Sequence, residues 1–405
     1  FVPFAPFVPF APFVPFAPFV PFAPFVTSMR PIQPWRQFDF LLLIVMLVLV
    51  ALGVAMIRSA TTNTPDLADL WRRQANFAII GLALFLLVAA APYTWWRPVW
   101  WLGYLVALGL LVLVLFIGRS EIGDVRRWFY IGSFRFQPSF PAMLLQVVAV
   151  AAVLNSRFRL KRRGSGDEES ENAPPGLIPY VLSGLLTLIV AALVFREPDL
   201  STAVIYVVAW IVMAFVSGVR LLYLIGTGLL AVAGMIPFWQ LMKEYQRQRL
   251  LVFLNPERDP GALYNIHQAL ISIGSGGLWG QGYGVGSQSQ LHFLRVRHTD
   301  FIFSVIGEEL GFIGTMLVFF LFTLIAWRLL RAAVLAPDRF GRLLVVGVGV
   351  ILYVPLLVNV GMNIGLLPVT GLPLPFISYG GTALVTYMTA LGLVESVAMR
   401  HQEKW

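Results

Sequence analysis

The sequence contains no cysteine, and only 12% of its 405 residues are charged. The absence of cysteine excludes disulfide bonds, thiolate catalysis and cysteine-ligated metal sites. Soluble domains carry roughly 25% charged residues. A charged fraction half that size excludes a soluble enzyme, a disordered chain and a coiled coil. Apolar residues predominate instead, because 58% of the residues are hydrophobic and the mean hydropathy is +0.80.

The few charges are unbalanced. Lys and Arg number 29 against 20 Asp and Glu, which gives a net charge of +9. In a membrane protein such an excess indicates contact with anionic lipid headgroups or handling of an anionic substrate. No basic stripe interleaved with aromatic residues occurs on a polar face, so nucleic acid is not expected as a partner.

The first 26 residues repeat the hexapeptide FVPFAP four times and then add FV. A helix would lose a hydrogen bond at each proline, so this segment is expected to be extended or polyproline II-like. It has no basic region and no cleavage-type ending, which argues against a signal peptide. We interpret residues 1–28 as a non-native leader and Met29 as the natural start, with a natural hydrophobic arm as the alternative.

Apolar runs near 20 residues recur from Met29 onward, and each is long enough to cross about 30 Å of hydrocarbon as a helix. The predicted fold is an all-α polytopic membrane protein in which residues 29–405 form a single domain of about ten transmembrane helices. The predicted spans are 38–58, 74–92, 98–117, 139–155, 177–195, 200–217, 220–240, 303–327, 343–364 and 375–398.

The distribution of Lys and Arg over the short loops sets the orientation. These residues favour the side that holds the N-terminus once the long 241–300 loop is discounted, as the positive-inside rule requires. Both termini are therefore expected inside the cell, and the 241–300 loop outside it.

Two adjacent arginines, Arg126 and Arg127, lie in an outer loop before Trp128. Guanidinium groups bind phosphate through paired hydrogen bonds, which makes both arginines candidates for substrate binding. The alternative is contact with lipid headgroups, with Trp128 in the interfacial aromatic belt.

The long outer loop carries Lys243 and Arg249 and then a glycine-rich run that begins at Gly274. Glycines let backbone N–H groups approach a ligand closely, although such runs are also simply flexible. A loop of this length in a compact membrane protein is more often functional than a spacer.

The end of this loop, Arg297 to Asp300, opens the eighth predicted span, and Glu308 and Glu309 follow about 12 Å further along the helix. A carboxylate at the membrane boundary is a good general-base candidate, although Asp300 could also be only a helix cap. Glu308 and Glu309 should face the protein interior or water, and pairing with an outer arginine is the structural alternative.

The stretch from Gly365 to Pro375 is uncharged and rich in helix-breaking residues. It is expected to form a re-entrant or irregular connection between spans nine and ten. Such backbone is tolerated at membrane depth only where it is buried in protein or lines a cavity.

Several strings together resemble the SEDS family of cell-wall polymerases, which includes RodA, FtsW and SpoVE. They are FREPDLSTA at 195–203, FLNPERDPGALYN at 253–265, IGSGGLWGQG at 273–282, HTDFIF at 298–303, EELG at 308–311 and NIGLLPVTGLPLPFISYGGT at 363–382. The residues before HTDF are more similar to those of the RodA, or elongation, branch. One departure stands out, because Phe140 to Met143 replace the charged residues that the family usually carries after Gln-Pro-Ser.

The resemblance implies a peptidoglycan glycosyltransferase of the bacterial inner membrane that polymerises lipid II on the outer face. It also implies a class B penicillin-binding protein as the partner that crosslinks the glycan strand. The family's essential aspartate corresponds to Asp300, the expected catalytic residue. The residues expected to contact substrate are Arg126, Arg127, Lys243, Arg249, His298, Glu308 and Glu309.

In the implied reaction, Asp300 takes the proton of an acceptor 4-hydroxyl, which attacks the anomeric carbon of the donor and displaces polyprenyl pyrophosphate. Arginine or lysine side chains, or a divalent cation such as Mg²⁺ or Mn²⁺, would neutralise the leaving group. The alternatives are a lipid II transporter and a non-catalytic scaffold for the transpeptidase. Charged residues near the centre of several spans would favour the transporter, and the sequence has almost none.

Overall fold

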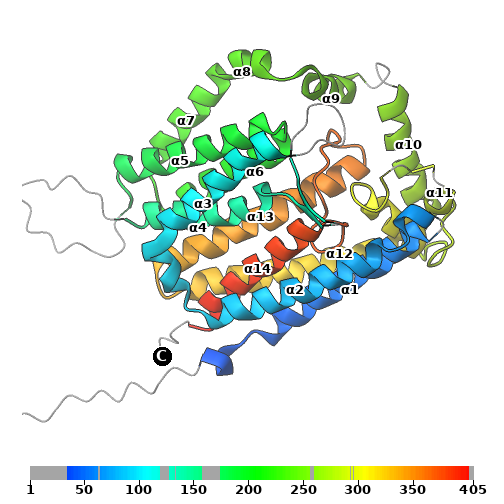
Figure 1. Ribbon diagram of the computed structural model, residues 1–405, viewed down its shortest axis with the longest axis horizontal. Helices are drawn as coiled ribbons and strands as arrows, with labels where there is room; N and C mark the ends of the chain where they lie inside the picture. The colour runs from blue at the N-terminus through cyan, green and yellow to red at the C-terminus, as the bar shows by residue number, and fades with distance from the viewer. Residues whose placement is uncertain are drawn as a thin grey trace, which may run out of the picture. The chain divides into compact units, whose positions relative to one another are not determined.

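The computed structural model describes residues 34–62, 64–118, 127–132, 134–156, 174–255, 260–291, 293–294 and 296–400. The expected leader at 1–28 and Arg126 lie outside these residues. Figure 1 shows a bundle of helices, and among the described residues the strands are confined to one short hairpin. The hairpin pairs β1 (Phe129–Ile131) with β2 (Phe134–Phe136) in antiparallel fashion.

Within the described residues, seven helices are long and apolar enough to cross a membrane. They are α1 (Phe40–Thr61), α2 (Leu70–Ala90), α3 (Trp96–Ile117), α5 (Leu177–Arg196), α12 (Ile302–Leu335), α13 (Arg339–Asn363) and α14 (Gly381–Ala398). Short 3-10 turns precede the first three of these helices at Pro34–Gln37, Pro65–Leu67 and Tyr93–Trp95.

The remaining three predicted spans have their own character. The helices α7 (Leu221–Ala233) and α8 (Met235–Leu241) pass the same test as a pair and are bent by 50° at their junction. The shorter apolar helices α4 (Ser139–Leu154) and α6 (Leu200–Val216) occupy the fourth and sixth predicted positions. Each of the ten predicted apolar segments therefore contains a helix, and the predicted multi-pass, all-α fold is confirmed.

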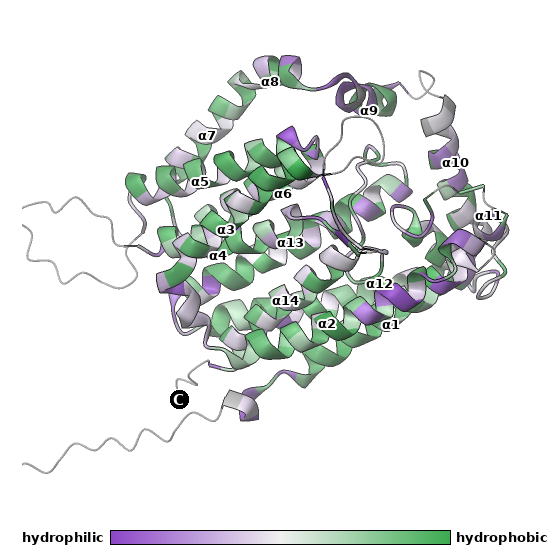
Figure 2. Ribbon diagram, viewed as in Figure 1, coloured by the Kyte–Doolittle hydropathy of each residue, from purple (hydrophilic) through white to green (hydrophobic). Residues whose placement is uncertain are grey.

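Hydrophobic residues predominate along both the central and the outer helices, whereas hydrophilic residues gather at helix ends and at α9 (Figure 2). Apolar side chains remain exposed along α2, α3 and α5, as expected for surfaces that face lipid. By contrast α4 buries 13 of its 16 residues, which makes it a central helix. Its short length is consistent with this central place, because about 24 Å of helix is less than the full hydrocarbon thickness.

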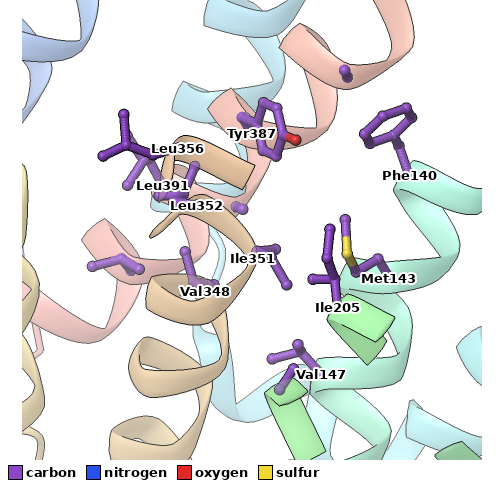
Figure 3. Close-up of a cluster of buried hydrophobic side chains, with 14 of the residues drawn as sticks. Phe140, Met143, Val147, Ile205, Val348, Ile351, Leu352, Leu356, Tyr387 and Leu391 are labelled. Atoms are coloured by element: carbon purple, nitrogen blue, oxygen red, sulfur yellow. The ribbon is translucent and has the colours of Figure 1, made fainter. Parts of the chain in front are cut away.

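The centre of the bundle is an apolar cluster in which α4, α6, α13 and α14 meet (Figure 3). Phe140 packs edge-on against Tyr387, with ring centroids 6.0 Å apart, and Met143 is fully buried. The segment that departs from the family pattern is thus a regular part of the core, and α4 begins at Ser139 as predicted.

The helix of the tenth predicted span begins later than predicted. We placed its start near residue 375, whereas α14 begins at Gly381. Pro373 and Pro375 cannot continue a helix, and Phe376 has a positive φ of 65°, so the chain stays irregular up to Gly380. Leu372, Leu374 and Ile377 are buried, as expected for an irregular connection packed inside the protein.

The long 241–300 loop contains helices α9 (Glu244–Leu254), α10 (Pro260–Ser275) and α11 (Ser287–Gln290). Figure 1 shows α7 and α8 leading away from the other helices, with α9 and α10 following along the same edge. No residue of α7 or α8 is buried, so this arm packs far less closely than the centre of the bundle.

Candidate functional site

The turn that precedes α12 carries the candidate base. Its start is the non-glycine residue Val296 at a positive φ of 51°, whose carbonyl accepts hydrogen bonds from the N–H groups of Thr299 and Asp300, each at 3.2 Å. The Arg297 guanidinium is buried and donates to the carbonyl of Ala60 at 2.5 Å. Arg297 therefore fixes this turn to the C-terminal end of α1 instead of facing solvent.

The irregular segment before α14 also holds this turn. The N–H of Tyr379 donates to the carbonyl of His298 at 2.9 Å, and the Ser378 hydroxyl donates to the carbonyl of Thr299 at 2.6 Å. Gln74 of α2 fixes the segment in turn, because its amide donates to the carbonyl of Ser378 at 3.1 Å. Three separate parts of the chain thus define the position of the turn.

Asp300 is partly buried, and its carboxylate interacts with the segment that contains Gly371 and with Arg249 of α9. A Cβ built on Gly371 would be 3.7 Å from its Oδ2, so the carboxylate faces this glycine at close range. Burial raises the pKa of Asp300, while the Thr299 hydroxyl and the positive charge of Arg249 act in the opposite direction. A carboxylate with a raised pKa accepts a proton more readily, as a general base requires.

Two basic residues of the long loop, Lys243 and Arg249, were predicted to contact substrate, and one of them acts on Asp300. Arg249 lies on α9, donates to the carbonyl of Thr370 at 3.4 Å and influences the Asp300 carboxylate electrostatically. Lys243 is exposed at the start of α9, about 9 Å along the helix from Arg249.

Arg127 is engaged with the backbone. Its guanidinium donates to the carbonyl of Glu197 at 2.8 Å and to that of Pro198. The buried Glu197 carboxylate has no hydrogen-bond partner among the described residues. Burial and neighbouring Asp199 raise the pKa of Glu197 to about 9, against the lowering effect of Arg127. Arg127 therefore supports the connection between α5 and α6.

His298 is partly buried, with its ring 6.0 Å from that of Tyr379. Burial, together with the charge of Arg297, lowers the pKa of His298 to about 4. The imidazole is consequently uncharged at neutral pH and can contact a substrate only as a neutral group.

Glu308 and Glu309 are buried within α12 and accept hydrogen bonds from inside the protein. The Glu308 carboxylate accepts from the backbone N–H groups of Gln288 at 2.7 Å and Ser289 at 3.1 Å. The Glu309 carboxylate accepts from the Ser59 hydroxyl at 2.5 Å. Their hydrogen bonds therefore fasten α11 and the end of α1 to α12, in place of the arginine pairing considered from the sequence.

The glycine-rich run packs against α12. The N–H of Phe312 donates to the carbonyl of Gly277 at 2.8 Å, beside Gly311, where α12 is interrupted at φ 66°. A Cβ on Gly280 would approach the Glu309 carbonyl oxygen to 2.2 Å, and one on Gly276 would approach the Gly307 oxygen to 1.9 Å. These glycines permit close contact between two backbones, which differs from the ligand contact suggested by the sequence.

Two basic residues that the sequence analysis did not single out act on the Tyr379 hydroxyl. Burial raises the pKa of the Tyr379 hydroxyl, whereas Arg73, which also forms a hydrogen bond with it, and Arg135 lower that pKa. Arg73 comes from α2 and Arg135 from β2, so their meeting point could not be seen in the sequence. Within the described residues, no group of three or more His, Asp or Glu side chains forms a metal-binding cluster.

Comparison with known proteins places this arrangement in context. A family model described as "Cell cycle protein", which carries the names FtsW, RodA and SpoVE, matches residues 39–403. The chain is 38% identical to peptidoglycan glycosyltransferase MrdB of Escherichia coli K12 over 369 residues, which cover 89% of this chain and 93% of MrdB. It is 33% identical to stage V sporulation protein E of Bacillus subtilis, with 89% and 96% covered.

Solved structures agree with these relationships. A chain from "Structural coordination of polymerization and crosslinking by a peptidoglycan synthase complex" superposes with a TM-score of 0.74 at 33% identity, covering 90% of this chain and 99% of that one. The crystal structure of Thermus thermophilus rod shape determining protein RodA superposes with a TM-score of 0.66 at 31% identity, covering 91% and 99%. The chain belongs to the FtsW/RodA/SpoVE family of membrane proteins.

Proposed function

We propose that this protein is a peptidoglycan glycosyltransferase that polymerises lipid II into glycan strands during cell elongation. Its relatives in Escherichia coli and Trichlorobacter lovleyi carry the name peptidoglycan glycosyltransferase, and the latter is 33% identical over 90% of this chain. Residues 29–405 would form a single catalytic domain in the bacterial inner membrane. The termini would be cytoplasmic and the Asp300 end of the bundle would face outward.

The observation that carries the proposal is the position of Asp300. Its carboxylate is partly buried beside Gly371, and its turn is fixed by α1 and by the segment before α14. In the proposed reaction Asp300 removes the proton from the acceptor 4-hydroxyl as that oxygen bonds to the anomeric carbon of the donor. The bond from that carbon to the pyrophosphate oxygen breaks, so direct attack inverts the anomeric configuration.

The leaving pyrophosphate needs positive charge, which the surrounding arginines can supply. Arg249 of α9 acts electrostatically on Asp300, and Arg73 and Arg135 act on Tyr379, whose N–H donates to the carbonyl of His298 in the turn. Preorganised cations of this kind stabilise charge that develops in the transition state. Arg126, Arg127 and Lys243 remain candidates for other parts of the substrate, and a divalent cation such as Mg²⁺ or Mn²⁺ could share the same role.

A class B penicillin-binding protein is the proposed partner, which would crosslink the strands made here. The similarity to a chain of a peptidoglycan synthase complex that joins polymerization to crosslinking supports this pairing.

Purified protein in liposomes, supplied with lipid II, tests the proposal when the products are resolved on gels. Polymeric glycan is expected from the wild type and at least about 100-fold less from Asp300→Asn, which keeps the shape of the side chain but lacks its basicity. Movement of lipid II between leaflets without polymer would instead support the transporter. Equal polymer from both proteins, with the transpeptidase present, would support the scaffold.

A further inference from the structure

We infer that Asn359 and Asn363 on α13 are positioning residues that hold Asp300 in its reactive orientation, an inference that rests on the proposed function. The side-chain amides of Asn359 and Asn363 donate to the backbone carbonyl of Asp300 at 3.1 and 3.0 Å. Both asparagines are completely buried. They lie four residues apart, which places them on the same face of the helix.

The same amides connect the two sides of the site. The Asn359 amide donates to the carbonyl of Leu372 at 2.8 Å as well as to that of Asp300. Leu372 follows Gly371, the residue that the Asp300 carboxylate faces. One side chain therefore fixes both the backbone that carries the carboxylate and the segment opposite it.

The orientation of the Asn363 amide is itself determined by its neighbours. Its oxygen accepts hydrogen bonds from the hydroxyl and the N–H of Ser304, at 2.6 and 3.3 Å, and its nitrogen donates to the carbonyl of Asn359 at 2.8 Å. Ser304 lies in the first turn of α12, directly after the turn that contains Asp300. The nitrogen of Asn363 is thereby directed at the Asp300 carbonyl.

Together with Ser378 and Tyr379, these amides complete a continuous backbone support. The carbonyls of His298, Thr299 and Asp300 all accept hydrogen bonds from the segment before α14 or from α13. Fixing three successive peptide units fixes the position of the Asp300 backbone and the direction in which its side chain leaves that backbone. Such restriction keeps the base in place before substrate binds.

A purely structural role would predict that removing any buried amide that links two helices lowers kcat in a similar way. Gln146 provides this comparison, because it is fully buried on α4 and donates to the Thr187 hydroxyl of α5 at 2.9 Å. It ties two helices together without any contact to the Asp300 turn. Differences between variants at these positions therefore separate positioning from folding.

The experiment compares Asn359→Ala, Asn363→Ala, the double variant and Gln146→Ala in liposomes with lipid II. For the asparagine variants we expect kcat to fall by roughly 10- to 100-fold, because small misplacements of a reacting group have effects of this size. KM for lipid II should change less than about twofold, since binding energy shared by ground and transition states is retained. Gln146→Ala should keep the kcat of the folded wild type.

The pH dependence of kcat/KM provides a second readout. Release of the turn would admit water to the Asp300 carboxylate, so its pKa would fall and the acidic limb of the profile would move to lower pH. A merely destabilised protein would keep the wild-type limb. If the double variant does not fold, Ser304→Ala, which removes one fixing contact of Asn363, should show a smaller change in the same direction.

The inference fails if the folded double variant retains the wild-type kcat and the wild-type acidic limb of the pH profile while Asp300→Asn has lost its activity. It also fails if Gln146→Ala produces the same loss of kcat and the same limb as the asparagine variants. The proposed function fails separately if the wild type itself makes no polymer.

Discussion

Two acidic sites lie within ten residues of one another and differ in how the protein treats them. The Glu308 and Glu309 carboxylates accept hydrogen bonds from backbone and hydroxyl groups of neighbouring segments. At Asp300 it is the backbone that is held, while the carboxylate lies partly buried toward Gly371 and Arg249. The two glutamates have their oxygens engaged by segments distant in the sequence, whereas the Asp300 carboxylate interacts with adjacent Thr299 and lies beside Gly371, and it is the main chain of Asp300 that other segments hold. Under the proposed function, this difference separates structural acids from the base.

The largest effect is expected from Asp300→Asn. Loss of a general base lowers reaction rates by roughly 10²–10⁴-fold, and the amide retains the size of the carboxylate. Initial rates of glycan synthesis from lipid II measure this loss, with thermal unfolding as the control for folding. A rate within about twofold of wild type would remove the distinction drawn between Asp300 and the two glutamates.

Arg249→Ala should have the next largest effect. The positive charge of Arg249 lowers the pKa of Asp300, so its removal should raise that pKa and move the acidic limb of the rate profile to higher pH. A loss of about tenfold at neutral pH corresponds to roughly 1.4 kcal/mol of transition-state stabilisation. Gln248→Ala, an exposed neighbour on α9, is the matched control. An unshifted limb in Arg249→Ala would show that this charge does not act on Asp300.

Glu308→Ala and Glu309→Ala should affect stability more than the rate of each folded molecule. Removing a buried acceptor leaves its donors unpaired, which costs about 1–3 kcal/mol per group. Thermal or denaturant unfolding measures this cost, alongside kcat and KM of the folded fraction. A raised KM at unchanged stability would instead favour the substrate-binding role predicted from the sequence.

The smallest effect is expected from His298→Asn. Burial and the charge of Arg297 lower the pKa of His298 to about 4, so the imidazole is largely uncharged between pH 6 and 8 and its titration contributes little there. The rate profile over this range should keep its shape, with only a minor change in rate. Loss of a limb near pH 6 in the variant would mean that His298 titrates during the reaction.

The helices were predictable because each transmembrane segment must be a long apolar run, whatever its neighbours. The start of α14 was misplaced because apolar residues between Pro375 and Gly381 continue the hydrophobic pattern while the backbone is irregular. A hydropathy average over a window of residues does not detect the prolines or the positive φ that keep this segment from forming a helix.

Within the site, the sequence predicted Asp300 as the base and Arg249 among the substrate-binding candidates, but neither their proximity nor what holds them. Asn359 and Asn363 are polar residues inside an apolar span, a signal that marks functional candidates and could have been used. Arg73 and Arg135 carried no such signal, because only the folded chain brings α2 and β2 to Tyr379. The glycine-rich run suggested a ligand loop or simple flexibility, and not packing against a helix, because close backbone approach to a ligand and to a helix need the same residue type.

The most direct test of the account is the pH dependence of kcat/KM for lipid II polymerisation by wild type and Asp300→Asn. The wild type should lose activity on acidification with one limb, at a higher pH than an ordinary aspartate would give, because burial raises the pKa of Asp300. That limb should be absent from the residual activity of the variant. An identical limb in both proteins, at comparable rates, would contradict the assignment of Asp300 as the base.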